Sequence, residues 1–143
     1  MRLIHQLDET DCGAACIAMI AAHFGLKKGI TSIREVAGTD RQGTNLAGLV
    51  KAAKELGFNA RAMKGDGDSF ITSLPVPFIA HTKEITEYGE ILHFVVVARV
   101  GKDRILVLDP GKGKIRYARK IFLMLRLFHL PYVQRLASYK TLV

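Results

Sequence analysis

Hydrophobic and small residues in the first part of the chain recur at helical spacing, which predicts three helices. The first covers the alanine-rich stretch CGAACIAMIAAHF, residues 12–24, and ends at Gly25. The second follows a capping-box pair, Ser32 and Glu35, and ends at Gly38. The third is capped by Thr44 or Asn45 and ends at Gly57, and its apolar face consists of Leu46, Leu49, Val50, Ala53 and Leu56.

Beyond these helices the pattern changes from helical spacing to alternation, which predicts strands. Residues 58–62 alternate, and FIAHT at residues 78–82 is a second strand candidate. Residues 93–100 and 105–109 are more strongly apolar, and the short polar link between them predicts a hairpin. Residues 117–128 are expected to form a final helix. Helices followed by antiparallel strands predict the α+β class.

The composition is that of one folded domain. The chain has 143 residues, of which 49% are hydrophobic and 24% are charged, which suits a single core. No apolar run reaches the roughly 18 residues that span a bilayer, and the first residues lack the apolar stretch of a secretion signal. We therefore expect the chain on the cytosolic side of a cell, with its two cysteines as reduced thiols.

The net charge of +8 is concentrated near the C-terminal end. Residues 1–109 contain 13 basic and 13 acidic side chains, and no acidic residue follows Asp109. A nucleic-acid-binding domain usually carries its basic residues across a folded face. A neutral body with a basic tail therefore argues against a nucleic-acid partner.

Two cysteines, Cys12 and Cys16, begin the first predicted helix, and several chemistries fit them. Cys12, between Asp11 and Gly13, meets the positive end of the helix dipole and unpaired backbone N–H groups, which favour a nucleophilic thiolate. Cys16, one turn further on among apolar neighbours, is expected to be a packed core thiol, and Cys12 can equally be one. A zinc site and a redox pair would both normally have a two-residue gap, which is absent here.

A thiolate enzyme also needs a base, a group that orients the base, and donors for an oxyanion. His93 is the strongest candidate base, because it stands at the entry to a buried strand that fixes its backbone. If the hairpin loop centres on Gly101, Asp109 lies opposite His93 and can orient the imidazole, whereas a one-residue shift would separate them. Asp109 before Pro110 and Gly111 is also ordinary turn chemistry.

The other histidines have simpler explanations, and one glutamine completes the candidate site. His5 has no evident third partner, His23 suits a helix end, His81 ends a short strand before charged residues, and His129 lies in the basic tail. Gln6 lies in the stretch before the helix, where its amide can donate toward the same point as the Cys12 N–H. These two donors would form an oxyanion hole, although a lone glutamine is usually a surface residue.

At these residues the chain resembles the bacteriocin-processing cysteine peptidases, which cleave leader peptides after a double glycine. The opening QLDETDCGAAC carries the resemblance, which continues through REVAGTDRQGTNLAGLVKAAKELGF, HFVVV and LDPGKGKIRY and covers residues 3–120. Such peptidases usually form the N-terminal cytosolic domain of ABC transporters. The resemblance implies a papain-like fold, in which a cysteine at a helix N-terminus faces a sheet that carries histidine and aspartate.

The resemblance also implies the role of each candidate residue. Cys12 would be the nucleophile, His93 the general base and acid, Asp109 the orienting group and Gln6 the oxyanion donor, with no role for Cys16. The implied function is cleavage of the leader from bacteriocin or lanthipeptide-type precursors, coupled to export. Its partners would be the precursor peptide and the transmembrane and nucleotide-binding domains of a transporter, at the cytoplasmic face of the membrane. We expect neither a metal nor a cofactor.

The C-terminal end departs from the family pattern, which normally closes with an acidic helix and an apolar strand. Residues 121–143 contain no acidic side chain. We therefore expect a peptidase domain over residues 1–120 and a basic apolar segment over 121–143, either part of that domain or an atypical tail that contacts a membrane. Two other functions stay open, a leader-docking module without catalysis and a membrane-surface adaptor. The retained cysteine favours an enzyme over a docking module.

Overall fold

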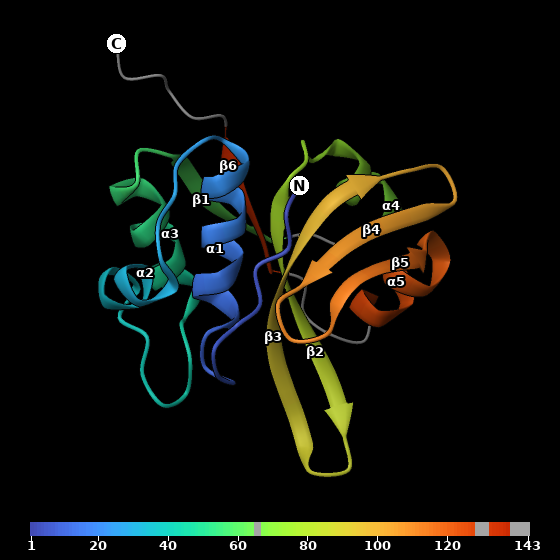
Figure 1. The fold of residues 1–143 in the computed structure, drawn as a ribbon. Helices are drawn as coiled ribbons and strands as arrows, with labels where there is room; N and C mark the ends of the chain where they lie inside the picture. Colours follow the sequence, from blue (N-terminus) through green and yellow to red (C-terminus); the bar gives the residue numbers. More distant parts are fainter. Residues whose placement is uncertain (65–66, 128–131, 138–143) are drawn as a thin grey trace.

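The computed structural model describes residues 1–64, 67–127 and 132–137 (Figure 1). Its elements are α1 (Cys12–His23), α2 (Ile30–Ala37), α3 (Leu46–Glu55), β1 (Asn59–Lys64), α4 (Gly67–Ser73), β2 (Phe78–Thr86), β3 (Gly89–Val100), β4 (Arg104–Asp109), β5 (Gly113–Ala118), α5 (Arg119–Leu127) and β6 (Tyr132–Ala137). The strands form one sheet in the order β1-β6-β2-β3-β4-β5, and all neighbours are antiparallel. The predicted α+β class is confirmed.

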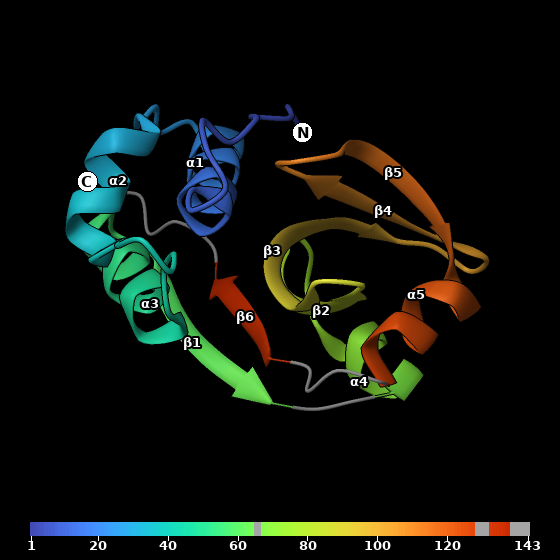
Figure 2. The same ribbon diagram turned by 90° about the horizontal axis from the view of Figure 1, so that it is seen from below.

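The molecule has a helical half and a sheet half, which lie side by side in Figures 1 and 2. Helices α1, α2 and α3 gather at the β1–β6 end, whereas β2 to β5 curve into a trough closed by α4 and α5. One core cluster joins α1 to the sheet and includes Ile17, Ile20, Leu49, Phe58, Ile79, Phe94, Val96 and Leu108. The other includes Ile71, Phe78, Val95, Val97, Ile105, Val107 and Phe122. The first of these clusters therefore holds the helical half against the sheet.

Small residues explain how α1 can be buried on all sides. Every residue from Cys12 to Ala21 is buried, and most of them are alanine, glycine or cysteine. A Cβ at Gly13 would lie 2.9 Å from Leu49 Cδ2 and 3.4 Å from Phe94 Cδ2, so this glycine allows the helix tip to approach both α3 and β3. The predicted helix over residues 12–24 agrees with the observed α1 within one residue.

The second helix begins earlier than predicted, and the capping-box interpretation of Ser32 and Glu35 is wrong. The N-cap of α2 is Gly29, in extended conformation, and it makes no side-chain cap hydrogen bond. The buried Ile30 pulls the first turn against the core, so the helix starts before the polar pair. Its end at Gly38, in the left-handed region, is as predicted, and Asn45 caps α3 by accepting the Gly48 N–H at 2.8 Å.

Three elements have no counterpart in the sequence prediction: α4, β5 and β6. β6 pairs with both β1 and β2, so it joins the sheet far from its neighbours in sequence. α5 crosses the boundary that we expected at residue 120, and His129 lies outside the described residues. Within the part of the chain that the structure describes, none of the helices is both long and apolar enough to cross a bilayer.

Gly48→Ala should destabilise the fold, because a Cβ at this position would lie 2.1 Å from the Ala37 carbonyl oxygen, a backbone atom that cannot move aside. We expect the free energy of unfolding to fall by about 1–3 kcal/mol, the usual cost of overpacking. Urea unfolding measures the difference. Gly29→Ala is the matched control, because no atom lies within 4 Å of its Cβ, and equal losses in the two variants would contradict the prediction.

Candidate active site

Cys12 is the first residue of α1, directly after the N-cap residue Asp11. It is 8% exposed, whereas Cys16, one turn further into the helix, is fully buried. Burial raises the pKa of the Cys16 thiol well above its usual range, and the nearby Cys12 and Asp109 add to that rise. A thiol held in this state is a poor nucleophile, so Cys12 is the thiol suited to chemistry.

His93 on β3 and Asp109 at the end of β4 are joined by a hydrogen bond of 2.7 Å between Nε2 and Oδ1. The same Oδ1 accepts the backbone N–H groups of Gly111 at 2.8 Å and Lys112 at 3.0 Å. Asp109 is therefore both a turn residue and the partner of an imidazole. The Cys12 thiol lies close enough to the ring to raise the pKa of His93, and because Nε2 bonds to Asp109, Nδ1 is the nitrogen that can face the sulfur.

The register of the β3–β4 hairpin differs from the predicted one. The observed pairs are Val96–Leu108, Val97–Val107, Arg99–Leu106 and Val100–Ile105, with a bulge between Val97 and Arg99. Continuing this register places Asp109 opposite position 95, so the expectation that it directly opposes His93 is wrong. The turn centres beyond Gly101 rather than on it. A shift of two residues keeps a side chain on the same sheet face, which is why the predicted contact still forms.

The environment of His93 favours its protonated form. Burial by itself lowers the pKa of His93, but hydrogen bonds to Asp109 and Cys12 and the charges of both groups outweigh burial and raise it to about 9. Burial likewise raises the pKa of Asp109, whereas its hydrogen bond to His93, the charge of His93 and two backbone N–H donors bring it below the usual 3.8. The imidazolium–carboxylate pair therefore persists across neutral pH.

Gln6 lies against the turn that follows Asp109. Its backbone N–H donates to the Pro110 carbonyl at 3.0 Å. A Cβ on Gly111 would lie 3.4 Å from Gln6 Oε1 and 3.5 Å from Asp109 Oδ1, so the glycine leaves room for the amide. Among the described residues, none hydrogen-bonds to Gln6 Oε1, although this atom is buried. The amide oxygen thus has unused acceptor capacity beside the His93–Asp109 pair.

A cleft of about 300 Å³ opens at Cys12 between the two halves. It is lined by Glu9, Cys12, Gly38, Asp40, Gln42, Gly43, Thr44, Asn45 and Leu46 on the helical side and by His81, Leu92 and Phe94 on the sheet side. The His81 ring stacks on Phe94, with ring centroids 4.1 Å apart. Burial and the charge of His93 lower the pKa of His81, so its ring is neutral at pH 7.

His81 was missed as a cleft residue when the sequence was considered alone. The sequence placed it at the end of a short strand, whereas β2 continues to Thr86 and pairs His81 with Phe94 of β3. The apolar stretch around Phe94 was visible, but the register that sets His81 against it depends on the β2–β3 turn. The strand pairing, rather than any local pattern, was the missing signal.

Comparison with known proteins assigns the family. The model of the Peptidase C39 family matches residues 1–125. The chain belongs to the Peptidase C39 family. The lactococcin-G-processing and transport ATP-binding protein LagD of Lactococcus lactis is 46% identical over 116 residues, which are 80% of this chain and 16% of LagD. The transport/processing ATP-binding protein ComA of Streptococcus pneumoniae is 40% identical over 109 residues, 76% of this chain and 15% of ComA.

Solved structures of C39 peptidases share the fold. The peptidase domain of Streptococcus ComA superposes with a TM-score of 0.81 and 31% identity, covering 96% of this chain and 98% of that domain. A double glycine motif protease from an AMS/PCAT transporter, crystallised with its leader peptide, has a TM-score of 0.80 at 23% identity and covers 94% of this chain and 89% of its own. The predicted family, the papain-like fold and the cysteine peptidase class are thus confirmed.

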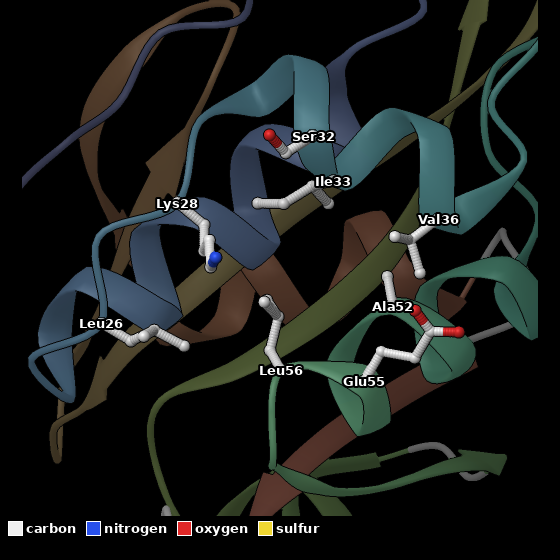
Figure 3. Close-up of a pocket in the computed structure, with 8 residues that line it drawn as sticks. All are labelled: Leu26, Lys28, Ser32, Ile33, Val36, Ala52, Glu55 and Leu56. Atoms are coloured by element: carbon white, nitrogen blue, oxygen red, sulfur yellow. The ribbon is translucent and has the colours of Figure 1, made fainter.

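This C39 domain has a second hollow, of about 380 Å³, within its helical half (Figure 3). Its lining residues are Leu26, Lys28, Ser32, Ile33, Val36, Ala52, Glu55 and Leu56. They come from the link after α1, from α2 and from the end of α3. The hollow shares no lining residue with the cleft at Cys12, so the two are separate features of the surface.

Asp109→Asn should lower the pKa of His93 from about 9 toward its usual 6.5, because it removes the Asp109 charge, one of the contributions that offset burial. An NMR titration of the His93 ring measures this directly. Because the folded pKa of His93 exceeds its unfolded value, the pair's stabilisation is complete below pH 6.5 and is lost as the pH rises through about 9.

The pH dependence of the unfolding free energy tests independently whether the pKa of His93 is raised in the folded protein. Relative to His93→Gln, the unchanged protein should lose unfolding free energy between pH 6.5 and 9, the interval between the unfolded and folded pKa values of His93. Urea unfolding at both pH values measures the loss. An unchanged His93 titration in Asp109→Asn, or parallel pH profiles of the two proteins, would contradict the assignment.

Proposed function

We propose that the chain is a cysteine endopeptidase that removes the leader of bacteriocin or lanthipeptide-type precursors after a double glycine. The observation that carries the proposal is the position of His93, which hydrogen-bonds to Asp109 and lies beside Cys12, so that a thiol, a base and an orienting carboxylate come together. The names of its relatives support the substrate class, since LagD processes lactococcin G. The double glycine motif protease shows that this fold can hold a leader peptide.

Acylation begins when the Cys12 thiolate attacks the carbonyl carbon of the second glycine. The Cys12 backbone N–H, at the tip of α1, and the Gln6 amide donate hydrogen bonds to the oxyanion that forms. His93 then gives its proton to the departing amine as the C–N bond breaks, which leaves a thioester on Cys12. The raised pKa of His93 keeps that proton available at neutral pH.

Deacylation uses the same residues in the reverse proton order. His93, now neutral, takes a proton from water, whose oxygen attacks the thioester carbonyl. The second oxyanion is held by the same two donors, and collapse releases the leader carboxylate and the Cys12 sulfur. Asp109 holds the imidazole by Nε2 throughout, so Nδ1 stays directed at the sulfur and the water.

The cleft at Cys12 accounts for a requirement for glycine next to the cleaved bond. Phe94 and Leu46 line the cleft from the sheet side and the helical side. A substrate with two residues lacking a Cβ can bring its backbone close to the sulfur without displacing these side chains. Residues further from the bond would lie toward Leu92, which is 60% exposed at the rim.

We place the chain beside a transporter on the evidence of its relatives alone. LagD and ComA are transport and processing proteins with ATP-binding parts, and this chain corresponds to 15–16% of their length. Cleavage at the cytoplasmic face of the membrane, coupled to export through transmembrane and nucleotide-binding domains, is the arrangement that we propose.

Cys12→Ala should abolish cleavage of a double-glycine leader peptide and leave leader binding intact, because it removes only the sulfur. Mass spectrometry of the products and fluorescence anisotropy of a labelled leader measure the two properties. Cys16→Ala is the matched control and should still cleave, since Cys16 is fully buried. Iodoacetamide should alkylate Cys12 rapidly and Cys16 slowly. An unchanged protein that binds leaders but cuts none in a panel would instead identify a docking module.

Gln6→Ala should lower kcat by about 100- to 1,000-fold with a much smaller change in KM, the usual result of removing one oxyanion donor. Steady-state kinetics on the same peptide measure the changes in kcat and KM separately. The rate of alkylation of Cys12 serves as the control, because iodoacetamide forms no oxyanion and should react at nearly the same rate. A rise in KM alone would assign Gln6 to leader binding.

A further inference from the structure

A buried carboxylate lies directly beside the candidate nucleophile, and the reaction steps do not use it. Asp11 is fully buried and immediately precedes Cys12. A negative charge in this position repels both a thiolate and an oxyanion, and the repulsion is strong where water is excluded. The position of Asp11 therefore requires a compensating feature of the fold.

Both oxygens of Asp11 are turned away from the helix that it caps. Oδ1 accepts from the Arg34 guanidinium, and Oδ2 accepts the backbone N–H of Asp8 at 3.1 Å. An N-cap aspartate ordinarily accepts an N–H of the second or third helical residue, but the Asp11 side chain makes no capping hydrogen bond to α1. The negative charge is thus held toward α2, and the first-turn N–H groups are not occupied by a carboxylate.

The same guanidinium also holds the turn that leads into α1. Arg34 bonds to Asp8 Oδ2 at 3.3 Å, and Asp8 Oδ1 accepts the Thr10 backbone N–H at 2.8 Å and its hydroxyl at 2.6 Å. Arg34 belongs to α2 and lies 23 positions beyond Asp11. One cation therefore fixes two carboxylates, Asp8 and Asp11, in the four residues that lead to the tip of α1.

We propose that Arg34 is a positioning residue for Cys12. Arg34 neutralises Asp11 and holds the Asp11 carboxylate away from the tip of α1. The thiolate and the oxyanion then experience the positive end of the helix dipole without an opposing charge. The inference rests on the proposed role of Cys12 as nucleophile, but it does not depend on which peptide is cleaved. It goes beyond the four residues already assigned, because Arg34 acts through Asp11 and touches no reacting atom.

The test is a double-mutant cycle that compares Arg34→Met in two backgrounds. In the unchanged protein, Arg34→Met leaves Asp11 unpaired and should slow alkylation of Cys12 by iodoacetamide by about 10- to 100-fold at pH 7. In the Asp11→Asn background there is no charge to neutralise, so the same substitution should change the rate by less than about threefold. Cleavage of a leader peptide should show the same pattern in kcat, with KM nearly constant.

Three further variants separate charge from structure. Arg34→Lys keeps the positive charge and should recover most of the rate. Asp8→Asn removes the exposed partner of Arg34, whose charge water screens, and should have an effect of less than about threefold. Arg61→Met removes an exposed arginine of β1 and is the matched control for loss of charge. Thermal unfolding of each variant shows that rates are compared between folded proteins.

Each outcome decides the inference. If Arg34→Met slows alkylation no more than Arg61→Met does, or slows it equally in both backgrounds, Arg34 has no charge-dependent role and the inference is wrong. If Arg34→Met does not fold, the comparison is made in the Asp11→Asn background, where Asp11→Asn and Asp11→Asn/Arg34→Met bury no unpaired charge. A difference above about threefold between these two variants overturns the proposal. Failure to cut double-glycine leaders, with alkylation still dependent on Arg34, would contradict the proposed substrate alone.

Discussion

The close approach of the α1 tip to β3 is the constraint on which the rest of the structure depends. Cys12 belongs to a helix and His93 to a sheet, so the proposed reaction requires two independently formed elements to meet. Gly13 makes the meeting possible, since any side chain there would crowd Phe94 and Leu49. The alanine-rich sequence of α1 has the same effect, because a helix with mostly small side chains can be buried between α2, α3 and the sheet.

How far the sequence predicted the fold follows from the range of the interactions involved. α1 and α3 were predicted well because their start and stop signals are local: Gly25, the Asn45 cap and Gly57 act within one turn. α2 was shifted because burial of Ile30, a tertiary effect, outweighed the polar pair that resembled a capping box. β6 was missed because its partners, β1 and β2, precede it by more than 45 residues, and no local pattern reports such pairing.

The candidate site was predicted from the sequence to the extent that its parts occur at element ends. Cys12 at a helix start and His93 at a strand entry are visible as such, and Asp109 follows from the hairpin with an error of two residues that the period of a strand tolerates. His81 and Arg34 depend instead on strand register and helix packing. Both were therefore invisible, although His81 lines the cleft and Arg34 bonds to the residue before the candidate nucleophile.

The electrostatic design around Cys12 is a balance of two buried carboxylates, each with its own cation. Asp109 is paired with His93, whose charge would change with each proton transfer in the proposed reaction, whereas Asp11 is paired with Arg34, whose charge is permanent. The difference fits their positions. A carboxylate that supports a proton-transferring base must tolerate a partner that becomes neutral, and three hydrogen bonds to Asp109 Oδ1 allow that. In the proposed role, the carboxylate beside the sulfur is neutralised at every stage, and a guanidinium, which stays charged throughout the working pH range, meets this requirement.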